Sequence, residues 1–165
     1  MTRAEKAVIF LEETGPALLQ NLTPETPAQW GMMTPQHMVE HLQYVTYIST
    51  GQDGKTIRIV SPAWARPVLK WFVLGYRPFP KNIKMPGKKI PGLLPLQHPS
   101  LDAAKAQLQQ TIADTLRYFL LHPGLRTNHP FAGSFSPLDW QIFHQRHFTH
   151  HFVQFGLLPD NTQNK

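Results

Sequence analysis

Four segments of the chain carry apolar residues at the three- and four-residue spacing of an amphipathic helix. The first should cover about residues 3–20, where Val8, Leu11, Leu18 and Leu19 form one apolar stripe. It should end before the proline-rich stretch that follows, because proline lacks the backbone N–H that a helix interior needs. An N-terminal amphipathic helix is therefore predicted.

The other three helices begin at recognisable capping signals. Thr34, Ser100 and Ser136 each precede a helical pattern, and proline follows Thr34 and Ser136 directly. A Ser or Thr hydroxyl can accept a free N–H of the first turn, and proline suits the first helical position. The predicted helices cover about residues 34–50, 100–121 and 137–155.

Residues 51–99 form a long crossover between the second and third of these helices. The crossover is rich in proline, so it can hold one short helix, at about residues 62–75. Connections of roughly 13, 50 and 13 residues then predict an all-α fold, a four-helix bundle with up-down-down-up order. The length of 165 residues fits a single domain over residues 1–165.

Positive charge is concentrated in this crossover. Residues 51–98 contain nine Lys or Arg against one acid, Asp53, and the whole chain has a formal net charge of +6. A nucleic-acid surface would explain such a cluster. A solvated loop is the favoured interpretation, because the run KNIKMPGKKIPG at residues 81–92 has no interleaved aromatic residues.

The chain contains no cysteine, which excludes disulfides, thiolate metal sites and iron–sulfur clusters. Any metal must therefore use His, Asp or Glu. No uncharged apolar run approaches the roughly 18 residues that a membrane span needs, and the N-terminal segment lacks the cleavage pattern of a secretory signal. We expect a cytoplasmic protein with no transmembrane segment.

The last predicted helix carries four histidines in the run HQRHFTHHFVQF at residues 144–155. At about 100° per residue, His144 and His151 lie roughly 20° apart, and His147 lies about 40° from His151. Trp140 and Phe148 share this side, so it should face the core. Imidazoles in an apolar environment need an ion or a hydrogen-bond partner.

This spacing predicts a metal site. His147 and His151 are four residues apart, which lets both rings reach one ion. We expect His41 to supply the third ligand, because it interrupts the apolar seam of the helix at residues 34–50. Three protein ligands leave a coordination position open, as in catalytic zinc sites. A site made only of nitrogen ligands accepts several divalent ions.

Other interpretations of the histidines stay open. Buried imidazoles can form a hydrogen-bonded core network, and haem can bind between two histidines without a covalent link. A carboxylate-bridged di-iron site fits worse, because the helix at residues 137–155 has no Glu and Glu40 points about 100° away from His41.

Several polar residues flank the expected ligands. His37 and His144 each lie one turn from an expected ligand, and we assign them proton transfer as catalytic residues. The alternatives are that either is a fourth ligand, supports a ligand by a hydrogen bond, or is a packed structural residue. Gln154 follows His151 by one turn, so it should contact substrate or hold an imidazole. His98, His122 and His129, expected in loops or at helix ends, receive no role.

Two segments of the sequence resemble a known superfamily. WGMMTPQHMVEHL and NHPFAGSFSPLDWQIFHQRHFTHHFVQFG are similar to segments of the DinB/YfiT-like superfamily of metal-dependent enzymes, in an uncharacterised bacterial branch. The specific part is an HxxHH run followed by Gln, paired with an upstream helical His before Leu. The resemblance covers both His-bearing helices and, by helix order, the whole chain.

The resemblance implies a four-helix bundle that holds a divalent metal, commonly zinc or nickel, on three histidines matching His41, His147 and His151. Members of known activity include transferases and isomerases that use low-molecular-weight thiols such as bacillithiol or mycothiol. This chain has Phe152 and Val153 where the commoner pattern has Arg-Gly before the Gln. That departure leaves the substrate open.

We therefore expect a metal-dependent enzyme that activates water or a low-molecular-weight thiol for hydrolysis or transfer, acting on a small molecule, with a homodimer as one option for its assembly. The alternative is a non-catalytic metal-binding stress or interaction module. In it, the basic and aromatic crossover segment 62–89 would bind a partner, an anionic membrane surface or nucleic acid.

Overall fold

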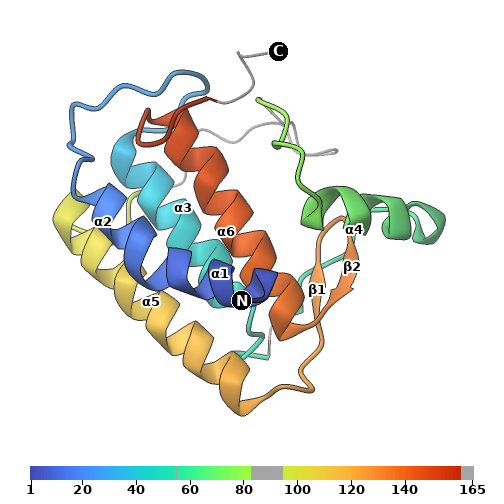
Figure 1. The fold of residues 1–165 in the computed structure, drawn as a ribbon. Coiled ribbons are helices and arrows are strands. Elements are labelled where there is room, and N and C mark those ends of the chain that lie inside the picture. Colours follow the sequence, from blue (N-terminus) through green and yellow to red (C-terminus); the bar gives the residue numbers. More distant parts are fainter. Residues whose placement is uncertain (55, 83–94, 161–165) are drawn as a thin grey trace.

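The computed structural model describes residues 1–54, 56–82 and 95–160, and most of the described chain is helical. Figure 1 shows the long helices packed alongside one another, with a shorter helix and a small hairpin beside them. In chain order the elements are α1 (Arg3–Ile9), a π-helical turn (Phe10–Thr14), α2 (Gly15–Leu19), α3 (Pro35–Ile48), a 3-10 turn (Ala63–Ala65), α4 (Arg66–Leu74), α5 (Leu101–Leu121), β1 (Thr127–His129), β2 (Gly133–Phe135) and α6 (Pro137–Gln154).

The predicted helix starts are confirmed by the caps. The Thr34 hydroxyl accepts the His37 N–H, and the Ser100 hydroxyl accepts the Ala103 N–H. At the start of α6, Ser136 and Asp139 form a reciprocal capping box. These bonds satisfy N–H groups that have no partner inside the helix, so they set where each helix begins.

The N-terminal helix differs from the regular helix predicted over residues 3–20. Its middle turn is π-helical, and the Gly15 N–H bonds to the carbonyl of Phe10 five residues earlier. Pro16 follows at once and has no N–H to continue the regular ladder. The helix therefore has one wider, π-helical turn, after which it continues as the regular helix α2.

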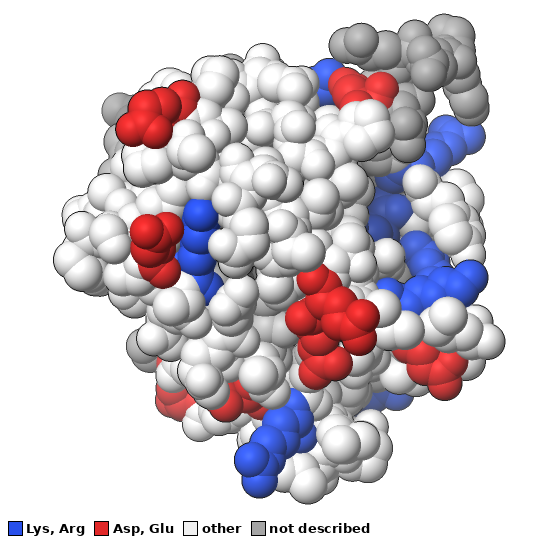
Figure 2. Space-filling view, turned by 60° about the vertical axis from the view of Figure 1, so that its left-hand side comes forward, with Lys and Arg blue, Asp and Glu red and all other residues white. Residues whose placement is uncertain are grey.

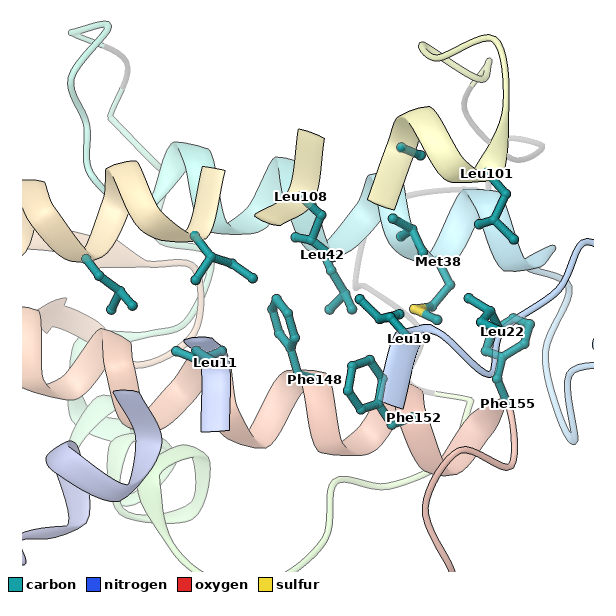
Figure 3. Close-up of a cluster of buried hydrophobic side chains, with 14 residues drawn as sticks. Leu11, Leu19, Leu22, Met38, Leu42, Leu101, Leu108, Phe148, Phe152 and Phe155 are labelled. Atoms are coloured by element: carbon teal, nitrogen blue, oxygen red, sulfur yellow. The ribbon is translucent and has the colours of Figure 1, made fainter. Parts of the chain in front are cut away.

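One core joins the long helices. In it α3 packs against α5, and α1 packs against α6. Figure 3 shows Leu11 and Leu19 from the N-terminal segment meeting Leu42 of α3, Leu108 of α5 and Phe148 of α6. Burial of an apolar side chain of this size contributes about 1.5–3 kcal/mol. This packing places the inward faces of α3 and α6 beside each other.

The chain is mostly helical, as predicted, and between α5 and α6 it also has a small two-stranded sheet that the sequence did not predict. There β1 and β2 pair antiparallel, with Thr127 opposite Phe135 and His129 opposite Gly133. Gly133 has a φ of 75°, a conformation that favours glycine. Strands of three residues are too short for an alternating pattern to reveal in a sequence.

The hairpin is fastened to both His-bearing helices through Thr127. Its hydroxyl donates to the Ser49 carbonyl at the end of α3 (2.7 Å) and accepts the Trp140 indole N–H of α6 (2.6 Å). The crossover helix predicted at residues 62–75 is confirmed as the 3-10 turn and α4. Most of the basic run predicted at residues 81–92 lies outside the described residues.

The far end of the crossover is attached to α3 by Glu40. This buried carboxylate accepts the backbone N–H groups of Gln97 (2.7 Å) and His98 (3.1 Å) and the side-chain amide of Gln36 (3.0 Å). Burial alone would raise the pKa of Glu40, but these hydrogen bonds outweigh it and lower the pKa. No helix in the described part of the chain is long and apolar enough to cross a membrane.

His129, which received no role from the sequence, is a buried structural residue of the hairpin. Its Nδ1 accepts the N–H groups of Phe131 (3.2 Å) and Ala132 (3.1 Å), and its ring stacks on Phe135. Nδ1 must therefore be unprotonated. Burial lowers the pKa of His129 to about 3.

Replacing His129 should change how acid unfolds the protein. Between pH of about 6.5 and 3 the unfolded chain binds a proton at His129 that the folded chain does not, so stability falls by up to about 1.4 kcal/mol per pH unit from this residue. His129→Asn keeps an acceptor near the turn but cannot titrate. We expect lower stability at pH 7 and a shallower loss on acidification, measured by urea unfolding in EDTA. An unchanged slope would contradict the assignment.

Candidate metal centre

Three imidazoles from α3 and α6 converge at one point in the structure. The Nε2 atom of His147 lies 3.0 Å from Nε2 of His41 and 3.1 Å from Nε2 of His151. One nitrogen from each ring lies within 4.8 Å of the others. The three residues that the sequence singled out as ligands are therefore adjacent in space, although His41 and His147 are 106 residues apart.

Helix geometry and core packing together produce this convergence. His147 and His151 are four residues apart on α6, so their rings lie on one side of the helix. His41 is one turn after the buried Met38 on α3 and directly before the buried Leu42. The contact between α3 and α6 then brings the ring of His41 within 5.0 Å of both other rings, measured between centroids.

Gln154 determines the tautomer of His151. The Gln154 amide nitrogen donates to the Trp30 carbonyl (2.8 Å), which orients the amide oxygen toward His151 Nδ1 (2.7 Å). An amide oxygen only accepts, so Nδ1 of His151 carries the hydrogen. In the neutral ring Nε2 therefore has a free lone pair, and it points toward the other two histidines. Metal-binding histidines usually donate their other ring N–H to an oxygen in this way, which fixes the tautomer and the orientation of the ring.

The three rings are neutral at ordinary pH. Burial is the main cause, and it lowers the pKa of His41 to about 4, with the nearby charge of His150 as a smaller contribution. Burial and then the neighbouring histidines lower the pKa of His151 to about 3 and that of His147 well below its usual value. Neutral imidazole is the form that coordinates metals.

Hydrogen bonding among the rings accounts for these contacts poorly. Since Nε2 of His151 carries no hydrogen, only one of the two contacts of His147 Nε2 can be a full hydrogen bond. A hydrogen on His147 Nε2 can point directly at one neighbour, and if His147 instead accepts from His41, no hydrogen is left for the contact with His151. A divalent cation accepts all three lone pairs. Ligand nitrogens at about 2.0–2.1 Å from one zinc ion lie roughly 3.0–3.4 Å apart, and both Nε2 contacts of His147 (3.0 and 3.1 Å) fall in this range. The donor set thus fits a divalent metal.

The surroundings of His147 are mostly apolar. Its ring stacks on Phe143, with centroids 5.3 Å apart, and its buried Nδ1 has no hydrogen-bond partner among the described residues. His41 and His147 nevertheless keep some exposed surface, whereas His151 is buried. The group is therefore held in a largely dry environment without being sealed from solvent.

The two residues assigned proton transfer lie outside the three-nitrogen group. His144 is buried, and its Nε2 lies 3.0 Å from the Ser49 hydroxyl, which itself donates to the Thr46 carbonyl. His37 is partly exposed, and its Nδ1 bonds to the Thr34 hydroxyl at 2.7 Å. His144 bonds to the C-cap residue of α3 and His37 to its N-cap residue, and no hydrogen bond links either ring to the converging nitrogens. Their proton-transfer role stays a prediction.

Sequence reasoning did not identify Trp30 and Gly31 as part of this site. Trp30 contributes its carbonyl, which any residue could supply, so no side-chain signal existed. Gly31 has a φ of 79°, and a Cβ at this position would lie 2.9 Å from the Gln154 amide nitrogen. A glycine is therefore needed here both for the backbone conformation and for the close approach.

Comparison with known proteins places most of this chain in one family. Residues 49–156 match the family described as Protein of unknown function (DUF1569). The chain belongs to the DUF1569 family. The DUF1569 match includes His147, His151 and Gln154 but begins after His41. No curated protein matches the chain, and no solved structure matches it.

The tautomer assignment predicts that Gln154 tunes metal affinity. Gln154→Met should weaken zinc binding by about 10–100-fold, because the ring of His151 would lose its Nδ1 acceptor and its orientation. The matched control is Gln43→Met, which alters a half-buried amide of α3 that bonds to Thr111. Competition against a chromophoric chelator measures the affinity. Equal affinity in both variants would show that Gln154 does not orient His151.

Proposed function

We propose that this chain is a metal-dependent enzyme of the DinB/YfiT-like kind, which binds one divalent ion, zinc or nickel, through His41, His147 and His151. The observation that carries the proposal is the convergence of three neutral Nε2 atoms from two helices. Neutral lone pairs that meet in an apolar environment are the arrangement by which proteins hold such ions.

The chemistry follows from the number of ligands. Three protein ligands leave room for an exchangeable ligand, and an ion in such a site lowers the pKa of a bound water or thiol. The substrate class we propose is a small molecule, attacked by water in hydrolysis or by a low-molecular-weight thiol in transfer. We place this activity in the cytoplasm.

The helix packing supports the superfamily assignment. The N-terminal segment, α3, α5 and α6 all contribute to one core, and the long crossover joins α3 to α5. We propose that they form an up-down-down-up four-helix bundle, the fold that the DinB/YfiT-like resemblance implies. In this arrangement the ligands come from α3, which precedes the crossover and α5 in the chain, and from α6, which follows them.

The neighbouring histidines would take different parts in this chemistry. His37 is partly exposed and one turn from His41, so it suits exchange of a proton with solvent. The Ser49 hydroxyl donates its own hydrogen to the Thr46 carbonyl, so it accepts a hydrogen from Nε2 of His144. This bond favours a role for His144 in positioning α6 beside α3. Burial lowers the pKa of His144 to about 3, so it would act as a neutral ring.

Metal content tests the proposal directly. Elemental analysis of untagged protein should find about one zinc or nickel ion per chain, the occupancy of a single three-ligand site. His147→Ala should lose most of it, and His122→Ala, which removes an exposed histidine at the end of α5, should retain it. If the unaltered protein neither contains nor binds zinc or nickel, the proposed function is wrong.

The second candidate function rests on the exposed face of α4. Trp64, Val68 and Trp71 have exposed fractions of 84%, 67% and 68%, and their spacing puts them on one side of the helical segment. Aromatic residues beside basic ones suit the interface of an anionic membrane. Under this alternative the metal would be structural, and α4 would anchor the protein to lipid.

Vesicle binding separates the two candidates. Under the alternative, the protein should sediment with phosphatidylserine vesicles at low salt, and the double variant Trp64→Ser and Trp71→Ser should release it. Leu120→Ser with Leu121→Ser is the matched control, because these α5 side chains are 79% and 65% exposed. Absence of binding at low salt would exclude the membrane alternative.

A further inference from the structure

A cleft of about 430 Å³ lies on the other side of α6 from the core, beside the candidate metal centre. Its walls are the start of α1, the segment that follows α4 and one face of α6, which presents Arg146, Thr149, His150 and Val153. A volume of this size suits a small-molecule ligand. The three converging histidines do not line it, so the cleft is a distinct feature.

The cleft is strongly basic. The described residues that line it include Arg3, Lys6, Arg77, Lys81 and Arg146, and among them Asp160 is the one acid. That carboxylate lies 2.7 Å from the Lys81 ammonium. Figure 2 shows Lys and Arg side chains gathered along the right-hand side of the face it presents. Charges of one sign in a concave surface attract a ligand of the opposite sign.

Two guanidinium groups meet at a single oxygen in this cleft. Arg3 and Arg146 both donate to the Gly75 carbonyl, and Arg146 also donates to the carbonyls of Phe72 (3.3 Å) and Arg77 (2.8 Å). Within residues 1–54, 56–82 and 95–160, neither guanidinium forms an ion pair with a carboxylate. Carbonyl oxygens satisfy N–H groups but do not neutralise the two positive charges.

Capping of α4 explains part of this arrangement, since a cation at a helix C-terminus is favourable. It does not explain why two cations share one carbonyl, nor why the buried Nε of Arg146 has no hydrogen-bond partner among the described residues. Burial, followed by the charge of Arg3, lowers the pKa of Arg146 to about 10. The cleft thus holds positive charge that the described chain leaves uncompensated.

Aromatic rings hold these cations in position. The Arg146 guanidinium lies 4.6 Å above the Phe79 ring, the Arg3 guanidinium lies 4.2 Å from the Tyr76 ring, and the Lys81 ammonium lies 4.7 Å from the Trp30 ring. Each distance is within the range of a cation–π contact. The charges are therefore preorganised, and the same rings offer an apolar surface to a ligand.

His150 separates this cleft from the metal centre. It lines the cleft, and its ring centroid lies 5.2 Å from that of His151 and 6.0 Å from that of Phe79. Trp30 also belongs to both regions, because its side chain lines the cleft and its carbonyl holds Gln154. A ligand in the cleft would thus lie next to the three-histidine group.

We propose that this cleft binds a small organic acid, with its carboxylate or phosphate group at Arg3, Arg146 and Arg77 and its apolar part against Phe79 and Val153. That the acid is a substrate of the metal centre rests on the proposed function, whereas its binding does not. The shared requirement is a compact anionic group attached to an apolar or aromatic body.

Calorimetry with simple probes tests the proposal. Phenyl phosphate and benzoate distinguish a phosphate from a carboxylate preference, and benzyl alcohol is the neutral analogue. At least one anion should bind more tightly than the alcohol, and its affinity should fall as salt rises. The double variant Lys6→Gln and Arg77→Gln removes two exposed cations and should weaken that binding about tenfold. Arg146→Gln should weaken it further.

Controls make each outcome decisive. Arg117→Gln removes an exposed cation of α5 outside the cleft and should leave binding unchanged. Each titration is repeated on EDTA-treated protein and on His147→Ala. Anion binding that survives metal removal supports the cleft even if the metal proposal fails. Three results would overturn the proposed anion site. These are loss of anion binding when the metal is removed, anion affinity no higher than that of benzyl alcohol, and unaltered affinity in the Lys6→Gln, Arg77→Gln double variant.

Discussion

The contact between α3 and α6 is the constraint on which this molecule depends. It forces three imidazoles into one small volume, with Nε2 atoms 3.0 and 3.1 Å apart, and it removes them from water far enough that all three stay neutral. A core of aliphatic residues would pack there at lower cost, because buried polar groups require partners. The Met38 and Phe148 core around them supplies the apolar packing that keeps the two helices together.

The ring nitrogens of the buried histidines near this contact have different hydrogen-bond partners, and the partners indicate different roles. His129 accepts two backbone N–H groups at Nδ1, and His144 bonds to Ser49 through Nε2, although its buried Nδ1 has no partner among the described residues. His151 uses only Nδ1 for such a bond, with Gln154, and leaves Nε2 directed at the other two rings. What distinguishes the three-nitrogen group is that nitrogens from three different rings converge on one point. This difference within one chemical class is what favours a metal there and structural roles elsewhere.

Charge and apolar packing are divided between two regions of the chain. The core formed by the long helices is made of apolar side chains. In contrast, Arg77 and Lys81 from the segment after α4 line the same cleft as Arg146 of α6. Because α6 presents His147 and His151 on one side and Arg146 and His150 on another, a single helix takes part in both the candidate metal centre and the basic cleft.

The sequence alone determined the features of this protein that depend on interactions between residues a few positions apart. The N-caps at Thr34, Ser100 and Ser136, the short helix of the crossover and the common face of His147 and His151 follow from hydrogen-bond capping and the helical repeat. Tertiary structure alone decided the rest. The ring of His41 meets the others only because α3 packs on α6, and the hairpin is held by the ring of His129, which packs against Trp140 and Phe143 of α6. The Gln154 bond to Trp30 joins residues 124 positions apart, and no periodicity in a sequence encodes contacts at such a distance.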